Sequence, residues 1–350
     1  MKKSLVALAL AGAFASAAQA QSVELYGIVD MGFVQEGGGP TGTAVSGSNP
    51  RGTIYKLTSG AQSGTRLGFK GTEDLGNGMK ALFVLETGIA ADKGGFNQAN
   101  AAFARQSFVG LQSDAGTVTM GRQYTPYFLT MLVGDPFAAG MAGAAQNMLM
   151  PGSNIRMDNA VKYTSPVFAG GFSGEAAYGF GEQADSLVRS RQLGAYLNYS
   201  SAPVNVRLGY LRKNTDVSTS ATKTDEISNW ILAANWDVKI AKLFAAITDN
   251  DEAIYAPIRR KSKDYLIGAQ VPFNKHTFIA SYIYKDGGQG MTGDANQLAL
   301  GYTYTMSKRT NLYAAWGRIN NGTNGFLTVG NNSDPGYGNR AVNLGIRHIF

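Results

Sequence analysis

Few side chains in this chain could do catalytic chemistry. Its 350 residues include two histidines and no cysteine, so a general base working near neutral pH would have to be His276 or His348. His276 stands beside a predicted short turn and His348 on the more apolar face of the final strand, and neither lies beside a plausible serine nucleophile. The sequence also lacks cysteine or histidine spacings for a metal, a phosphate-binding glycine loop and a nucleophile elbow. We therefore predict no enzymatic activity, no cofactor and no metal site.

Charged side chains offer a different chemistry, the attraction and steering of ions. Arg66 lies on the opposite face of its predicted strand from Phe69, so it faces water. Arg105 shares the parity of Ser107, opposite Phe108, and is assigned to the water-facing side on the same grounds. The alternation predicts further water-facing charges, which are Lys70, Lys80, Lys162, Asp30 and Glu86. This set is basic on balance and favours anions, although solvated side chains without a role in selecting solutes are the alternative.

The first 20 residues have the layout of a secretory signal peptide. Lys2 and Lys3 precede an apolar run at residues 5–14, and a small-residue pattern ending at Ala20 follows. Cleavage there leaves residues 21–350 with a net charge of +5, because two of the 31 basic residues are lost against 24 acids. The positive residues alternate with apolar ones rather than forming one patch, which argues against nucleic acid as a partner.

The pattern after residue 20 is that of many strands with two different faces. The chain has 45 glycines, 34 tyrosines and phenylalanines, and only 10 prolines, a composition that favours strands and turns over long helices. Apolar and polar residues alternate with a period of two, and short turns alternate with long loops. We count 16 strands, seven short turns and eight longer loops. This layout predicts an all-β fold, a 16-stranded antiparallel transmembrane β-barrel over residues 21–350 with one face toward lipid and one toward water.

One connection, residues 125–157, is unusually long and apolar. Its only charged residues are Asp135 and Arg156, so it needs an apolar wall to pack against. The simplest place for it is inside the barrel, where it would narrow the bore and act as a constriction loop. A short helical insertion on an ordinary β-sandwich is the alternative.

Several stretches of the chain carry a resemblance to a known family. These stretches are residues 25–30 (LYGIVD), 66–76 (RLGFKGTEDLG), 108–111 (FVGL), 117–124 (TVTMGRQY), 159–166 (NAVKYTSP) and 345–350 (GIRHIF). In them the chain resembles the Gram-negative general porins, and most of all the trimeric outer-membrane porins of β-proteobacteria. The resemblance covers essentially the whole chain.

The resemblance implies a homotrimeric, water-filled channel for passive diffusion of small hydrophilic solutes and ions. In the family, arginines on the barrel wall face acidic residues of the third loop, and the matching positions are Arg66, Arg105 and Arg156. The loop here has Asp135 as its only carboxylate, which favours an anion-selective pore. A channel specific for a sugar or an organic anion is the alternative, although Tyr26 and Tyr196 alone do not make an aromatic path. A barrel hydrolase is a third and weaker reading.

The resemblance also implies partners in the outer membrane of a Gram-negative bacterium. The basic residues 259–263 could bind lipopolysaccharide phosphates or attract anions to the channel mouth, and a plain solvated loop is the alternative. Outer-membrane lipids would surround the barrel. The final strand, with His348 and the terminal Phe350, would be the signal read by the barrel assembly machinery.

Overall fold

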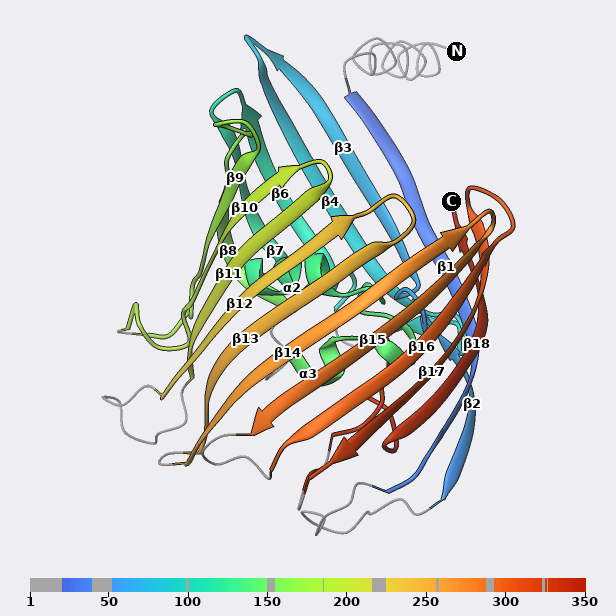
Figure 1. Cartoon of the computed structure of the whole chain (residues 1–350). Coiled ribbons are helices and arrows are strands. Elements are labelled where there is room, and N and C mark those ends of the chain that lie inside the picture. Colours follow the sequence, from blue (N-terminus) through green and yellow to red (C-terminus); the bar gives the residue numbers. More distant parts are fainter. Residues whose placement is uncertain are drawn as a thin grey trace.

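The computed structural model describes residues 21–39, 52–98, 101–149, 155–184, 186–215, 225–255, 258–287, 293–322, 325 and 327–350 (Figure 1). The predicted signal peptide, residues 1–20, lies outside the described residues, and so do the side chains of Arg259 and Arg260.

The strands pair with their neighbours in an antiparallel sheet that closes when the last strand pairs with the first. The strands are β1 (Gln21–Gly37), β2 (Thr53–Ser59), β3 (Arg66–Gly76), β4 (Met79–Ala90), β5 (Gly95–Phe96), β6 (Gln106–Ser113), β7 (Gly116–Tyr124), β8 (Arg156–Thr164), β9 (Phe172–Gly179), β10 (Gln192–Ser201), β11 (Val204–Thr215), β12 (Asp225–Asp237), β13 (Lys242–Tyr255), β14 (Ile258–Phe273), β15 (His276–Gly287), β16 (Ala295–Thr305), β17 (Thr310–Asn321) and β18 (Arg340–Ile349). β2 and β3 pair with successive halves of β1 and form one interrupted barrel strand. β5 pairs only with the end of β4, in a separate sheet. The barrel therefore has 16 strands, as predicted.

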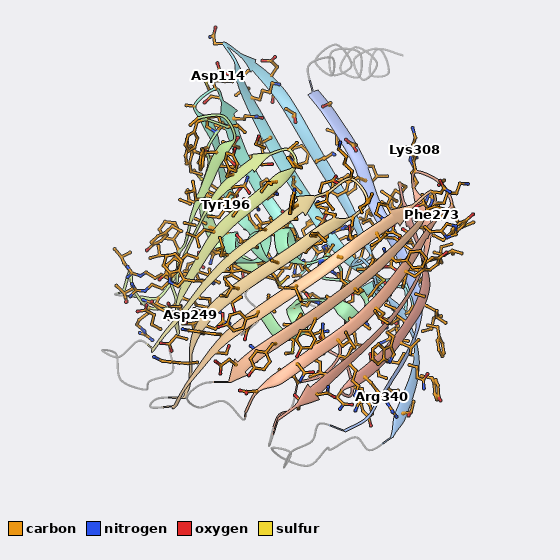
Figure 2. The ribbon with its side chains drawn as sticks, in the orientation of Figure 1. Asp114, Tyr196, Asp249, Phe273, Lys308 and Arg340 are labelled. Atoms are coloured by element: carbon orange, nitrogen blue, oxygen red, sulfur yellow. The ribbon has the colours of Figure 1, made fainter. Side chains whose placement is uncertain are left out.

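The two faces of the wall differ as the alternation predicts. On β16, Leu298 and Leu300 are 44% and 53% exposed, whereas Gln297 and Ala299, which alternate with them, are fully buried. In Figure 2, Asp114 and Lys308 lie at the end of the barrel with the short turns, and Asp249 and Arg340 lie toward the opposite end. Short periplasmic turns and longer external loops are the usual arrangement of such barrels.

The chain terminus completes the closure of the barrel. The Gly27 amide donates to the Phe350 carbonyl (2.9 Å), and the Phe350 amide donates to the Gly27 carbonyl (3.1 Å). The ring of Phe350 lies over Gly27 so closely that a Cβ at this position would overlap it. The last residue thus extends the pairing of β1 with β18, which leaves no open edge there.

The connection between β7 and β8, residues 125–155, is the constriction loop, and its described part up to residue 149 folds into the barrel (Figure 1). It contains α2 (Pro126–Gly134), η1 (Met141–Gly143) and α3 (Gln146–Leu149). The Thr125 hydroxyl caps α2 by accepting from the Phe128 amide at 3.1 Å. None of the helices in the described ranges is long and apolar enough to cross a membrane.

The inner wall is not uniformly polar, which differs from the simple expectation of one face for lipid and one for water. The constriction loop buries large side chains such as Tyr127, Met131 and Leu149. Opposite them, the inner wall presents a row of buried aliphatic side chains, which are Leu211, Ile231, Leu266, Ile283 and Ile319. The loop and this part of the wall form the apolar core of the molecule.

Glycines on the inner wall let the constriction loop approach closely. A Cβ at Gly268 would lie 2.7 Å from the Pro136 ring, and one at Gly317 would overlap the carbonyl of Ala142. The loop therefore lies in a groove that side chains would fill.

Two other segments also enter the barrel, and the sequence did not predict either of them. The first is the inner bend, residues 60–65, which interrupts the second barrel strand. Asp30 holds it, because its carboxylate accepts from the Gln62 amide (2.8 Å), the Ser63 amide (2.5 Å) and the Tyr313 hydroxyl (2.7 Å). The second is the last loop, residues 327–339, where Asn332 bonds both the inner bend and the constriction loop.

Candidate functional site: the pore constriction

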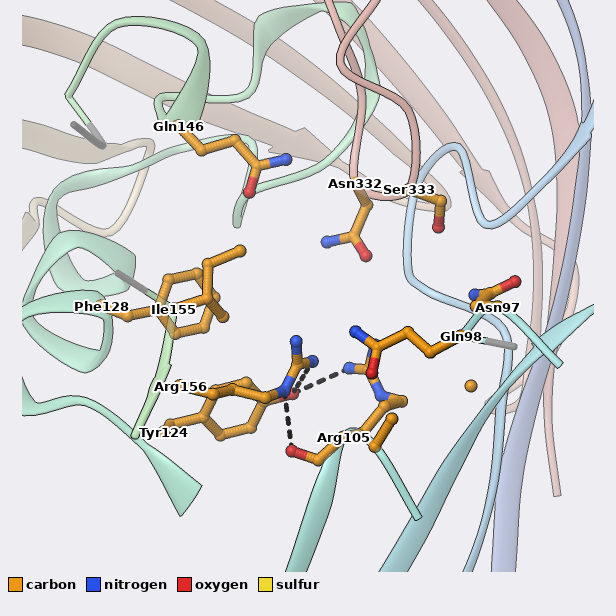
Figure 3. Close-up of a pocket in the computed structure, with 12 residues that line it drawn as sticks. Asn97, Gln98, Arg105, Tyr124, Phe128, Gln146, Ile155, Arg156, Asn332 and Ser333 are labelled. Carbon is orange, nitrogen blue, oxygen red and sulfur yellow. Dashed lines mark hydrogen bonds between the residues drawn. The ribbon is translucent and has the colours of Figure 1, made fainter. Parts of the chain in front are cut away.

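The open side of the bore lies away from the wall that the constriction loop covers. α2 packs mainly on β10 to β13, and η1 packs on β16 to β18. A cavity of about 250 Å³ remains between the loop, the last loop and the wall near β4, β7 and β8 (Figure 3). It is lined by Arg105, Tyr124, Gln146, Arg156 and Asn332, among others. The predicted arginines Arg105 and Arg156 are therefore brought together here.

Tyr124 organises these two arginines (Figure 3). Its hydroxyl accepts from Arg105 Nη2 at 2.8 Å and from Arg156 Nη2 at 3.5 Å, and the Arg156 guanidinium lies 5.0 Å from the centre of its ring. Arg156 Nε also donates to the Arg105 carbonyl at 2.7 Å. Arg105 Nε donates to Glu86 at 2.8 Å, so Arg105 is ion-paired, whereas Arg156 has no ion-pair partner among the residues that the structure describes. The arrangement fixes two guanidinium groups at one point of the wall.

Arg105 reaches the lumen for a different reason from the predicted one. Phe108 lies on the inner face, because Gln106 of the same face pairs with Glu86, while Val109 points outward and is 59% exposed. The parity argument based on Ser107 was therefore wrong. Arg105 precedes the start of β6, where the strand alternation does not yet apply, and its amide donates to the Glu86 carbonyl at 3.1 Å.

Three further arginines line the wall. Arg66, predicted from the sequence, pairs in register with Ile28 and Gly88 and makes no ion pair within the described part of the chain. Arg347 donates to Asn311 (3.0 Å) and to the Ser63 hydroxyl (2.9 Å). Arg207 donates to the Leu129 carbonyl of α2 at 3.1 Å and is held by Asn198 and the ring of Tyr196.

Arg207 and Arg347 are functional candidates that the sequence analysis did not single out. Both show the inward parity that identified Arg66, so the signal was present in the alternation. What the sequence could not show is which segments inside the barrel these arginines contact: Arg207 donates to the Leu129 carbonyl of the constriction loop, and Arg347 donates to Ser63 of the inner bend. With Arg66 and Arg156, they make four arginines without a carboxylate partner among the described residues.

The other predicted charges are mostly neutralised or remote. Lys70 pairs with Glu24 at 3.1 Å, and Lys162 pairs with Glu175 at 3.2 Å. Lys80 is exposed near the turn of the β3–β4 hairpin, beyond the constriction. Asp30 is fully buried beneath the inner bend, and Glu86 is 3% exposed beside Arg105.

Asp135 corrects a sequence-based expectation. We expected it to face the wall arginines across the pore, but its side chain is 2% exposed. Its oxygens accept from the amides of Phe137 (2.9 Å), Ala139 (2.7 Å) and Ala145 (3.0 Å). Burial raises the pKa of the Asp135 carboxyl to about 6, against the lowering effect of these three bonds. Asp135 therefore shapes the loop backbone and presents no acidic surface to the lumen.

A buried polar network fixes the constriction loop to the wall. The Tyr127 hydroxyl donates to the Leu149 carbonyl (2.8 Å) and lies 3.2 Å from Asn250 Oδ1, which links both ends of the helical part of the loop to β13. Asn250 in turn donates to Asp264 at 2.9 Å. Asp264 is fully buried and pairs with Lys285 at 2.6 Å. The position of the loop therefore depends on a charge pair beneath it.

Removing one partner of this pair should strongly destabilise the protein. Lys285→Met leaves the Asp264 carboxylate buried without its cation, which costs about 3–5 kcal/mol. When samples are heated before gel electrophoresis, the folded band converts to the unfolded band at a characteristic temperature. We expect this temperature to be clearly lower for Lys285→Met than for the unchanged protein. Adding Asp264→Leu should restore most of the loss, and Lys263→Met on the exposed face of β14 should have no effect. An unchanged conversion temperature for Lys285→Met would mean that the pair contributes nothing to loop anchoring.

Comparison with known proteins identifies the family to which the chain is similar. The profile of the Gram-negative porins matches residues 6–324. An outer membrane porin protein of Bordetella pertussis is 32% identical, and outer membrane porin protein 32 of Delftia acidovorans is 33% identical, each alignment covering 100% of both chains.

Solved structures agree with the sequence matches. The anion-selective porin from Comamonas acidovorans is 28% identical, with a TM-score of 0.79 over 94% of this chain and 100% of that one. OmpT of Vibrio cholerae in its trimer form, at 16% identity and a TM-score of 0.68 over 95% of this chain and 100% of that one, supports the fold alone. The family consists of channels rather than enzymes. The chain belongs to the Gram-negative porins and is an outer-membrane channel protein.

Proposed function

We propose that this porin is a passive channel for small hydrophilic solutes and that it prefers anions. The observation that carries the proposal is the set of four wall arginines, Arg66, Arg156, Arg207 and Arg347, without carboxylate partners among the described residues. The anion-selective porin from Comamonas acidovorans, which the chain resembles at 28% identity, supports the same direction.

The physical basis is an electrostatic field with one dominant sign. In a pore where acids faced arginines, the field would run across the bore and discriminate weakly by charge. Here the acidic residue of the constriction loop is buried against backbone amides, so no carboxylate of the described part of the loop opposes the arginines. The positive potential at the constriction lowers the electrostatic energy of an anion and raises that of a cation. The low-dielectric surroundings strengthen this effect.

A channel specific for an organic anion is the second candidate function. The paired guanidinium groups of Arg105 and Arg156 on Tyr124 suit a carboxylate, because a guanidinium can bind both of its oxygens. An aromatic path for sugars has less support, since Tyr26 donates to Glu86 and Tyr196 lies under Arg207. Saturation of the current by an organic acid at low concentration would favour specificity over general diffusion.

Ion substitution in planar bilayers tests the proposed preference. Replacing potassium by the slower lithium at constant chloride should leave the single-channel conductance nearly unchanged. Replacing chloride by the slower acetate at constant potassium should lower it clearly. The opposite ranking would overturn the proposal, because the current would then be carried by cations.

We propose that the channel is a homotrimer in the outer membrane, surrounded by lipids and lipopolysaccharide. The basis for the trimer is the resemblance of the sequence to trimeric porins, and OmpT of Vibrio cholerae, which has a similar fold, is described in a trimer form. Cleavage of a signal peptide after Ala20 follows from the sequence. Chemical cross-linking of outer-membrane fractions tests the trimer, and the mass of the mature protein tests the cleavage site.

The C-terminal strand is the proposed signal for the barrel assembly machinery. Phe350 is 40% exposed over Gly27, and His348 lies on the same outward face beside the Thr310 hydroxyl (2.9 Å). Deleting Phe350 should therefore impair insertion and yield unfolded, degraded precursor. The measurement is heat-modifiable mobility of outer-membrane fractions, with His348→Ala as the companion variant. Folded protein at normal levels after deletion of Phe350 would show that the terminal ring has no assembly role.

A further inference from the structure

A second basic pocket lies at the opposite end of the bore from the long loops. It has a volume of about 160 Å³ and is lined by Thr303, Thr305, Ser307, Lys308, Arg309 and Arg347, among others. We call it the mouth pocket. Thr303, Thr305 and Arg347 belong to the inner faces of β16 and β18, and the turn from Ser307 to Thr310 forms its rim. In Figure 2, Lys308 marks this end of the barrel.

The chemistry of the lining is one-sided. Lys308, Arg309 and Arg347 bring three positive charges, and the residues that line the pocket include no carboxylate. The remaining lining groups are hydroxyls and amides, which can donate hydrogen bonds to oxygen atoms of an anion. A pocket of this composition favours an anion over a cation or an apolar solute.

Two hydrogen bonds fix the guanidinium of Arg347 and leave others of its N–H groups for a ligand. Its Nε donates to Asn311 and its Nη1 donates to Ser63 of the inner bend, at 3.0 and 2.9 Å. A guanidinium carries five N–H groups, so three have no hydrogen-bond partner among the described residues and are available to a ligand. Asn311 also donates to Gln62 at 2.9 Å, which closes the inner side of the pocket with a fixed amide pair. The guanidinium is therefore oriented in advance, which lowers the cost of binding.

We propose that the mouth pocket binds a small oxyanion, such as phosphate or the carboxylate of an organic acid, on the periplasmic side of the constriction. An oxyanion presents several oxygens to the planar guanidinium and the surrounding hydroxyls, which a chloride ion cannot do. Arg347 and Arg66 flank β1, opposite Asp30 and Ile28, so the pocket adjoins the arginine-lined wall. This inference rests on the proposed anion preference. It adds a second binding site, separate from the cavity at Arg105 and Arg156.

Block of chloride current by phosphate tests the site in single channels. Phosphate added to the short-turn side should block at lower concentration than phosphate added to the other side. Arg347→Gln should raise the half-blocking concentration on that side roughly tenfold or more, because a hydrogen bond to a charged group is lost. Acetate in place of phosphate shows whether a carboxylate binds as well.

Further variants separate binding from structure. Because Arg347 also holds Ser63, the double variant Lys308→Gln and Arg309→Gln changes only exposed turn residues, and it should raise the half-blocking concentration several-fold. Lys239→Gln, on the exposed turn between β12 and β13, removes one positive charge, as Arg347→Gln does, and should leave block unchanged. Block that is equal from both sides, or unchanged in both pocket variants, would overturn the site. A cation-selective zero-current potential would instead overturn the proposed function, so the two failures are distinguishable.

Discussion

Removing the centre of the constriction loop, residues 131–149, should raise the unitary conductance. The narrowest segment sets the resistance of a water-filled pore, so we expect an increase of roughly twofold. The gain is limited because the inner bend and the last loop also enter the barrel and remain in place. Single-channel recording in symmetric potassium chloride measures the effect.

The deletion also uncovers the aliphatic inner wall, so folding must be checked in the same samples. Heat-modifiable mobility on gels reports whether the barrel still closes. Lys285→Met is a useful companion, because it loosens the anchor of the loop without shortening the chain. A folded deletion variant with unchanged conductance would show that the constriction loop does not narrow the bore.

Neutralising three of the wall arginines should lower the anion preference sharply, with Arg207 and Arg347 left in place to account for what remains. A unit charge about 4 Å from a permeating ion is worth about 1 kcal/mol in water. With Arg66, Arg105 and Arg156 all changed to Gln, we expect the chloride-to-potassium permeability ratio to fall roughly tenfold after allowing for screening by salt. The loss of Arg105 also frees Glu86, which then adds an uncompensated negative charge to the wall.

A matched variant distinguishes local charge from net charge. Lys80, Lys239 and Lys263 are exposed and lie outside the constriction, and changing all three to Gln removes the same three charges. This control should keep the permeability ratio close to that of the unchanged protein. Equal shifts in the two triple variants would mean that overall charge, rather than the arginines of the constriction, sets selectivity.

The strand alternation and the long apolar loop allowed the barrel and its constriction to be predicted. Both depend on local rules, because lipid demands apolar residues on one face and backbone pairing demands closure. The final strand was placed correctly for the same reason, and the register of Arg66 with Ile28 agrees with the inward parity assigned to this arginine. Inward charges also followed from parity, although the ion pairs that neutralise Lys70 and Lys162 did not.

The sequence concealed the contacts of irregular backbone segments, which follow no periodicity. Asp30 has the parity of a lumen charge, yet it is buried because residues 60–65 fold over it. Asp135 is the only acid of its loop, and its carboxylate accepts hydrogen bonds from three backbone amides, which no periodicity in the sequence predicts. Arg105 lies before its strand begins, where alternation gives no information. Each departure comes from irregular backbone meeting the inner wall.

The zero-current potential in a potassium chloride gradient tests the anion preference most directly. The account predicts that the dilute compartment becomes negative, because chloride crosses faster than potassium. The potential should weaken as salt is raised, since the Debye length falls from about 30 Å at 0.01 M to about 3 Å at 1 M. A dilute compartment that becomes positive at low salt would contradict the account, because the arginine wall would then fail to select anions where its field reaches furthest.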